Sequence, residues 1–104
     1  MSNLDFPAFP IHPGEILKDE FRARRLSQKY FAEVTGIPYT MLNDVLNARR
    51  PISTDFALTM EAALNISAEM LINMQMRYNL QIARRDEEKA KRWDELSRIC
   101  AALL

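Results

Sequence analysis

The stretch from Ser27 to Arg50 has the pattern of two short helices joined by a tight turn. Ser27 can cap the first helix by accepting a hydrogen bond from a free backbone N–H group. Leu26 and Phe31 flank this serine at the spacing of a hydrophobic staple. Gly36 stands where the corner needs a positive φ, and Pro38 stands where a second helix can begin. Two short helices with such a corner predict a helix-turn-helix.

The spacing of three side chains supports this prediction. Ala32 lies four residues before Gly36, and Leu42 follows six residues after it. The small side chain lets the two helix axes approach, the glycine forms the corner, and the branched apolar side chain fills the angle. The same local pattern also fits an αα-hairpin of a plain helical bundle that binds no nucleic acid, because short motifs also match by chance.

The second helix of this pair has an apolar face and a polar face. Met41 or Leu42 is expected to be buried together with Val45 and Leu46, because these residues recur at helical spacing. The side chains left exposed are polar or amphipathic: Tyr39, Thr40, Asn43, Asp44 and Asn47. Such a face on the second helix is the part of a helix-turn-helix that enters the major groove of DNA.

Length and composition indicate a single small domain. The chain has 104 residues, of which 48% are hydrophobic. No apolar run approaches a membrane span, and the N-terminus has no secretory signal pattern. The one cysteine, Cys100, excludes an internal disulfide. We therefore expect a cytoplasmic protein with no membrane contact.

The charge balance limits how this chain could bind DNA. It has 14 Lys and Arg residues against 14 Asp and Glu residues, with a pI of about 6.6. Between residues 27 and 50, Lys29, Arg49 and Arg50 stand against Glu33 and Asp44, a net charge of +1. Phosphate neutralisation supplies much of the affinity of DNA-binding proteins. Any DNA affinity here must come from a few well-placed groups and from dimerisation.

Three segments are expected along the chain. Residues 1–11, with Phe6, Phe9 and two prolines, have no helical period and predict an extended N-terminal arm that packs on its own domain or on a partner. Residues 12–83 predict the helix-turn-helix DNA-binding domain. Residues 84–104 predict a charged amphipathic C-terminal helical extension.

Further helices of the domain have recognisable starts and apolar stripes. Proline at the first position predicts a helix from His12 to about Arg24, and Ser53 and Ser67 predict caps of two later helices. The predicted inward stripes are Ile16, Leu17 and Phe21 in the first of these, Phe56, Met60, Ala63 and Leu64 in the second, and Met70, Leu71, Met74 and Tyr78 in the third. The third helix has more apolar surface than one face needs, which indicates either a homodimer interface or a methionine-rich core.

The C-terminal extension has an apolar strip around the single tryptophan. Ala90, Trp93, Leu96, Cys100 and Leu103 recur at intervals of three or four residues. The strip must fold back, pair across a dimer or receive another protein, and Cys100 is expected to be a small core residue. The predicted dimer contacts are Met70, Met74, Tyr78 and Trp93.

No pattern of an enzyme is present. His12 is the only histidine, so a histidine pair for a metal and a histidine beside a serine or cysteine nucleophile are both absent. With two glycines in the chain, no glycine-rich phosphate loop can form. We expect no catalytic residues, no metal and no cofactor, and His12 is interpreted as a helix-start residue.

The sequence resembles HigA-type antitoxins of the Xre/Cro-like helix-turn-helix proteins. The residues that carry the resemblance are distributed over the predicted domain: His12–Leu17, Leu26–Gln28, Ala32, Gly36–Pro38, Asn47, Arg49, Arg50, Ile52, Ser53, Ala57, Leu71–Gln75 and Tyr78–Leu80. The resemblance implies an all-α, five-helix Xre/Cro (lambda-repressor-like) domain with an additional C-terminal helix, and a homodimer formed by the C-terminal half. It further implies binding to palindromic operator DNA and neutralisation of a HigB-type toxin, a RelE-like mRNA endonuclease encoded beside it.

The resemblance also assigns roles to residues. It places Gln28, Arg49 and Arg50 at the DNA backbone and Tyr39, Thr40, Met41 and Asn43 in the major groove. We also expect phosphate contacts from Ser27 and Lys29, and we count Pro38 and Asn47 among the DNA-binding residues. Family members often have arginine at the position of Met41 and glycine at that of Ala48. Two alternatives stay open, an orphan Xre-family regulator with no toxin and a toxin-binding module with little DNA affinity.

Overall fold

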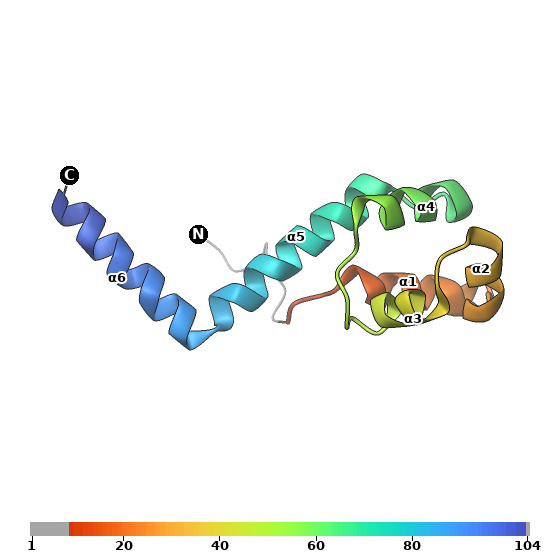
Figure 1. Ribbon diagram of the computed structural model, residues 1–104, viewed down its shortest axis with the longest axis horizontal. Helices are drawn as coiled ribbons and strands as arrows, with labels where there is room; N and C mark the ends of the chain where they lie inside the picture. Colours follow the sequence, from red (N-terminus) through yellow and green to blue (C-terminus); the bar gives the residue numbers. More distant parts are fainter. Residues whose placement is uncertain (1–8, 104) are drawn as a thin grey trace.

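The computed structural model describes residues 9–103, and within them the chain forms six helices and no strand (Figure 1). The molecule is elongated, with extents of 57 × 28 × 21 Å. This arrangement confirms the predicted all-α fold class. The helices are α1 (Pro13–Ala23), α2 (Gln28–Thr35), α3 (Tyr39–Leu46), α4 (Thr54–Leu64), α5 (Ala68–Arg85) and α6 (Glu87–Leu103).

The predicted helix starts are confirmed by their hydrogen bonds. The hydroxyl oxygens of Ser27, Ser53 and Ser67 each accept a hydrogen bond from the backbone N–H three residues later, at 3.1 Å in each case. His12 caps α1, because its Nδ1 atom accepts from the N–H of Gly14 at 2.9 Å. Each cap satisfies an N–H group that has no partner inside its own helix.

The helix-turn-helix corner forms as the spacing predicts. Gly36 has a φ of 78°, a left-handed conformation that glycine adopts without a steric penalty. Ala32 is buried between α2 and α3, and Leu42 is completely buried in the angle. The rings of Phe21 and Phe31 meet edge to face, with their centroids 5.0 Å apart. The core is built from every helix from α1 to α5: Leu17, Phe21, Phe31, Ala32, Leu42, Val45, Leu46, Ile52, Phe56, Ala57, Met60, Leu64, Ile66, Ala68 and Leu71.

Gly14 allows α1 to contact the backbone of α3. A Cβ atom at this position would lie 1.9 Å from the carbonyl oxygen of Val45. No side chain fits there, so the glycine sets the close approach of the two helices. This approach places α1 directly behind the C-terminal end of α3.

Three of the predicted inward residues are exposed: Ile16, Ala63 and Met70. Helical periodicity gives the direction of a buried face, whereas the width of that face depends on the neighbours. Of the pair Met41 and Leu42, Leu42 is the buried residue and Met41 is half-buried.

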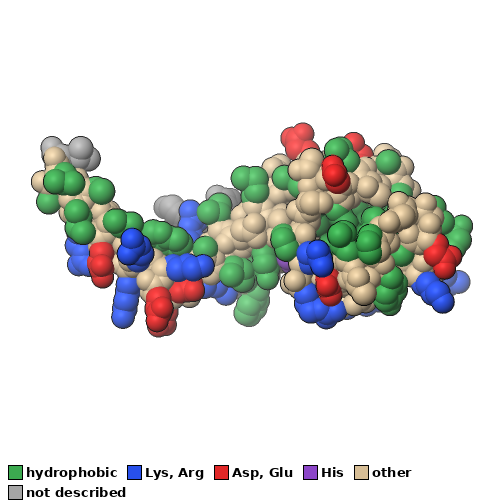
Figure 2. All heavy atoms as spheres, viewed as in Figure 1, with side chains coloured by type: hydrophobic (Ala, Val, Ile, Leu, Met, Phe, Trp, Pro, Cys, Tyr) green, Lys and Arg blue, Asp and Glu red, His purple; other side chains and the backbone are tan. Residues whose placement is uncertain are grey.

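The extension neither continues α5 nor folds back on the domain. Asp86 has extended torsions between α5 and α6, and α6 projects away from the body (Figure 1). No described residue of α6 is buried. Hydrophobic side chains line one side of it and charged side chains the other (Figure 2). The prediction that Cys100 is a small core residue is therefore wrong, because its side chain is exposed.

The beginning of the predicted arm, including Phe6, lies outside the described residues. Phe9 is 75% exposed and does not pack on its own domain. Among the helices of the described region, none is long and apolar enough to cross a membrane.

Candidate nucleic-acid interface

The face of α3 that points away from the core is positioned by α1 and α2. Leu42, Val45 and Leu46 anchor the helix in the core with almost no exposed surface. Tyr39 and Thr40 are exposed at its first turn, and Pro38 precedes it as the N-cap residue. The remaining predicted groove residues are half-buried: Met41, Asn43 and Asn47.

Asn43 connects α3 to both neighbouring segments. Its Nδ2 atom donates to Oε1 of Gln28 at 3.0 Å, and its Oδ1 atom accepts from the guanidinium of Arg49 at 2.8 Å. The structure thus brings together three of the predicted contact residues. Because both polar atoms of the Asn43 side chain are engaged, its orientation is fixed from the start of α2 and from the end of α3.

Asp44 pairs with both arginines that follow α3. Its Oδ1 atom lies 3.3 Å from Nε of Arg49, and its Oδ2 atom lies 3.8 Å from a guanidinium nitrogen of Arg50. Sequence reasoning placed Asp44 on the exposed face and gave it no role. Separations of five and six residues do not match the three- or four-residue spacing of helical pairs, so the pairing depends on the turn at Ala48.

Asn47 connects the end of α3 to α1. Its Nδ2 atom donates to the carbonyl oxygen of Asn43, and its Oδ1 atom accepts from Nζ of Lys18, both at 2.9 Å. Lys18 adds a positive charge at the edge of this face. Because Lys18 and Asn47 are 29 residues apart, no local pattern indicated their contact.

The loop after α3 turns sharply to present the two arginines. Ala48 has a φ of 60°, and the N–H of Arg49 donates to the carbonyl of Asp44 at 2.8 Å. Both guanidinium groups are about half exposed, so they are accessible at the surface.

Two buried polar side chains, His12 and Gln75, make hydrogen bonds with the backbone of this loop. His12 makes a hydrogen bond with the backbone of Arg50, and its ring meets that of Tyr78 edge to face at 4.9 Å. Gln75 accepts at Oε1 from the N–H of Ile52 and donates at Nε2 to Asn79, both at 2.9 Å. These bonds connect the arginine-bearing loop to α1 and α5.

Burial lowers the pKa of His12 below its ordinary value of 6.5, and the bond with Arg50 and the charge of Glu15 oppose this effect only in part. The neutral ring suits the cap, because Nδ1 must remain an acceptor.

The start of α2 presents the remaining predicted phosphate contacts. The Oγ atom of Ser27 is engaged by the N–H of Tyr30, and Lys29 is exposed. The first N–H groups of a helix attract anions through the helix dipole. Lys29 also lines an open hollow of about 540 Å³ together with Tyr39.

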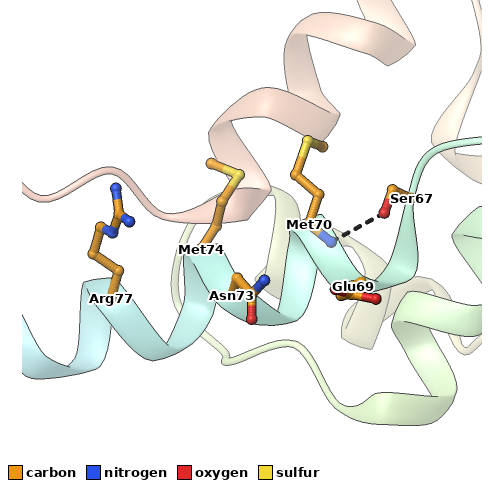
Figure 3. Close-up of a pocket in the computed structure, with 6 residues that line it drawn as sticks. All are labelled: Ser67, Glu69, Met70, Asn73, Met74 and Arg77. Atoms are coloured by element: carbon orange, nitrogen blue, oxygen red, sulfur yellow. Dashed lines mark hydrogen bonds between the residues drawn. The ribbon is translucent and has the colours of Figure 1, made fainter.

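The predicted dimer residues lie on α5 and α6, and one of them, Tyr78, also lines a hollow with Arg49 and Arg50. Met70 and Met74 line an open hollow of about 570 Å³ along α5, and their side chains extend from the same side of the helix (Figure 3). Tyr78 follows on α5 with its ring against His12. Trp93 is on α6 and is 47% exposed.

The chain matches a helix-turn-helix family model and is similar to solved antitoxin structures. The helix-turn-helix family model matches residues 17–71. A virulence-associated protein I of Dichelobacter nodosus is 32% identical over 79 residues, covering 75% of this chain and 73% of its own length. An addiction module antidote protein of the HigA family from Coxiella burnetii superposes with a TM-score of 0.72 at 30% identity, covering 84% of this chain and 94% of its own. The Pseudomonas aeruginosa antitoxin HigA, solved with the higBA promoter, gives a TM-score of 0.72 at 33% identity, covering 78% of this chain and 89% of its own.

Proposed function

Because the chain belongs to the Xre-like helix-turn-helix family, among the HigA-type antitoxins, we propose that it binds operator DNA in its own promoter and represses transcription there. As a member of this family it is a regulator and not an enzyme. The observation that carries the proposal is the exposed face of α3, followed directly by two accessible arginines. The similarity to an antitoxin solved with promoter DNA supports the same function.

In this proposal α3 enters the major groove. Tyr39, Thr40, Met41, Asn43 and Asn47 face base edges or the thymine methyl group. The contacts that position the protein come from the start of α2 and from the loop after α3: Ser27, Gln28, Lys29, Arg49 and Arg50. Met41 has no hydrogen-bonding group, so apolar contact is its contribution.

The proposal includes a homodimer. Two copies would present two α3 helices to half-sites about one helical turn apart, roughly 34–36 Å. Met70, Met74, Tyr78 and Trp93 are the proposed contacts. The exposed apolar side chains of α5 and α6 support this, because a subunit alone leaves Met76, Leu80 and Ile99 at least half exposed. Sedimentation of the wild type and of Trp93→Ala would test it, and we expect the variant to dissociate at a higher concentration.

We also propose that the dimer neutralises a HigB-type toxin, a RelE-like mRNA endonuclease, and that it acts in the cytoplasm, where DNA and ribosomes are found. Co-expression with the product of the neighbouring gene tests this. The expected result is a stable complex that no longer cleaves mRNA. A neighbouring gene product that is inactive as an endonuclease, or that never forms a complex, would favour an orphan regulator.

The DNA-binding function is tested by fluorescence anisotropy. A duplex from immediately upstream of the gene is compared with a scrambled duplex at several salt concentrations. We expect tight, selective binding that weakens steeply with salt. Equal and weak binding to both duplexes would contradict the proposal and direct attention to protein partners of α5 and α6.

Two variants separate the proposed roles within the interface. Arg50→Ala should weaken binding to every duplex and lower the salt slope by about one for each bound subunit, because each subunit loses one phosphate contact. Asn43→Ala should change the order of preference among operator variants, because it removes a side chain that faces base edges. If both variants changed affinity in the same way, the division of roles would be wrong.

A further inference from the structure

Asp44 holds the two arginines that the proposed function assigns to DNA phosphates. Each of its carboxylate oxygens faces a different guanidinium group, at 3.3 Å for Arg49 and 3.8 Å for Arg50. The Asp44 side chain is 34% exposed and less accessible than either arginine. One carboxylate thus serves both positive charges at the end of α3.

The guanidinium of Arg49 is engaged on two sides. Its Nε atom faces Asp44, and its terminal nitrogen donates to Oδ1 of Asn43 at 2.8 Å. A phosphate that approaches this group from its Nε side competes with the carboxylate for the same N–H donor. The same holds for the terminal nitrogen of Arg50 that faces Asp44.

The position of Asp44 is unfavourable for an anion without these partners. It lies in the last turn of α3, where the helix dipole repels negative charge. The two arginines offset this repulsion. When DNA phosphates bind the two arginines, Asp44 is left unpaired at the C-terminus of α3 and close to those phosphate groups.

We propose that Asp44 is an internal competitor for the DNA backbone, and this inference rests on the proposed DNA-binding function. It occupies Arg49 and Arg50 in the free protein and so lowers affinity for every duplex, irrespective of sequence. After binding, the unpaired carboxylate takes up a cation, which reduces the net release of ions and makes the salt dependence shallower. Asp44 is therefore a positioning residue for the two arginines and is not a reader of bases.

The test is Asp44→Asn, which retains the size of the side chain and removes its charge. We expect this variant to bind the operator duplex and the scrambled duplex about five to ten times more tightly than the wild type at moderate salt. The ratio of the two affinities should stay unchanged. The plot of log affinity against log salt should become steeper by about one for each bound subunit. Asp44→Ala should give the same changes, and far-UV circular dichroism shows that each variant is folded.

The matched control is Asp94→Asn. Asp94 pairs with Arg98 on α6 at 3.0 Å, so this variant loses the same charge and also breaks an aspartate–arginine pair, away from α3. Its affinity should equal that of the wild type. A gain as large as that of Asp44→Asn would show a general effect of net charge and overturn the inference.

A second background shows whether Asp44 acts through the arginines. In the double variant Arg49→Gln/Arg50→Gln, adding Asp44→Asn should give less than half of the gain, on a logarithmic scale, that it gives in the wild type. An undiminished gain would mean that Asp44 repels DNA directly, and a changed ratio between operator and scrambled duplex would mean that it reads bases. Either result overturns the inference while leaving the proposed function intact. If the wild type and Asp44→Asn both fail to bind any duplex at low salt, the proposed function fails as well.

Discussion

Ala48 adopts a backbone conformation that residues with a Cβ atom rarely adopt. Its φ is 60°, at the sharp turn between α3 and the two arginines. Left-handed torsions cost a non-glycine residue about 1–2 kcal/mol, whereas glycine adopts them readily but loses more chain entropy on folding. Members of the family that the sequence resembles often have glycine at this position, and the positive φ angle gives the physical reason for that preference.

We therefore predict that Ala48→Gly raises the free energy of unfolding by about 0.5–1 kcal/mol. Urea denaturation followed by circular dichroism measures it. The control is Ala62→Gly, an exposed position inside α4, where the same exchange should destabilise by about 0.5–1 kcal/mol. Equal signs for the two variants would contradict the explanation.

His12 makes stability depend on pH. Burial lowers its pKa below 6.5 in the folded chain, while the unfolded chain retains the ordinary value. Below pH 6.5 the unfolded state binds a proton before the folded state does, so stability falls as the pH falls, by at most about 1.4 kcal/mol per pH unit. The loss ends below the folded-state pKa, where both states are protonated.

His12→Asn isolates this effect, because asparagine also caps helices and does not titrate. The free energy of unfolding should be measured from pH 8 downward by urea denaturation. Because His12 is the only histidine, the difference in free energy of unfolding between the wild type and the variant should shrink steadily below pH 6.5. A constant difference between the two curves would show that His12 has the same pKa in both states.

At the scale of the elements, Gln75 is the connection between α5 and the loop that carries the arginines. It is 5% exposed and satisfies the N–H of Ile52. Gln75→Leu should destabilise the protein by about 1–3 kcal/mol, because that buried N–H loses its acceptor. Urea denaturation gives the value.

Gln81→Leu is the matched control for Gln75→Leu, because Gln81 is half-buried on the same helix. We expect it to change the free energy of unfolding by about 0.5 kcal/mol or less. If both substitutions lowered the free energy of unfolding equally, the decrease would come from the surface of α5 and not from the lost bond to the loop.

The parts of the fold that the sequence predicted are those that local chemistry decides. Ser27 caps α2 and Gly36 forms its corner because the partner groups lie within a few residues. The bond between Gln75 and Ile52 joins residues 23 positions apart and is made only after the helices have packed, whereas the bond between Gln75 and Asn79 lies within α5. The helical spacing of apolar residues predicted a role for Met74, but it gave no information about the adjacent polar residue, Gln75. In the candidate interface, Asn43 and Arg49 were predicted, whereas Lys18 depends on the approach of α1.

At the scale of the whole molecule, Asp86 separates the body from α6. Its backbone is extended, its Oδ1 atom accepts from the N–H of Lys89 at 3.1 Å, and its carbonyl accepts from the N–H of Ala90 at 2.9 Å. The residue thus ends α5 and caps α6. No proline or glycine is needed for the break, because the aspartate side chain satisfies the new helix start.

Asp86→Ala should join α5 and α6 into one helix, because alanine favours helix and cannot cap. Spin labels at Cys100 and at an introduced Glu69→Cys report this, with unlabelled protein added to dilute contacts between copies. In a continuous helix these positions would be about 46 Å apart, and the bent chain should give a shorter distance. Asp86→Asn retains the cap and should retain the bend. An unchanged distance in Asp86→Ala would show that the cap does not hold the bend.

Because a single residue separates α5 from α6, a change in the backbone torsions of Asp86 rotates the whole of α6 relative to the body. With 17 residues the helix is about 25 Å long. A rotation of about 10° at Asp86 would therefore displace its far end by about 4 Å, while the core around Leu42 keeps its packing. Leu103, at that far end, travels farther than Trp93 for the same rotation. Small differences in the torsions of one aspartate thus decide how far from the body the apolar side of this helix can reach.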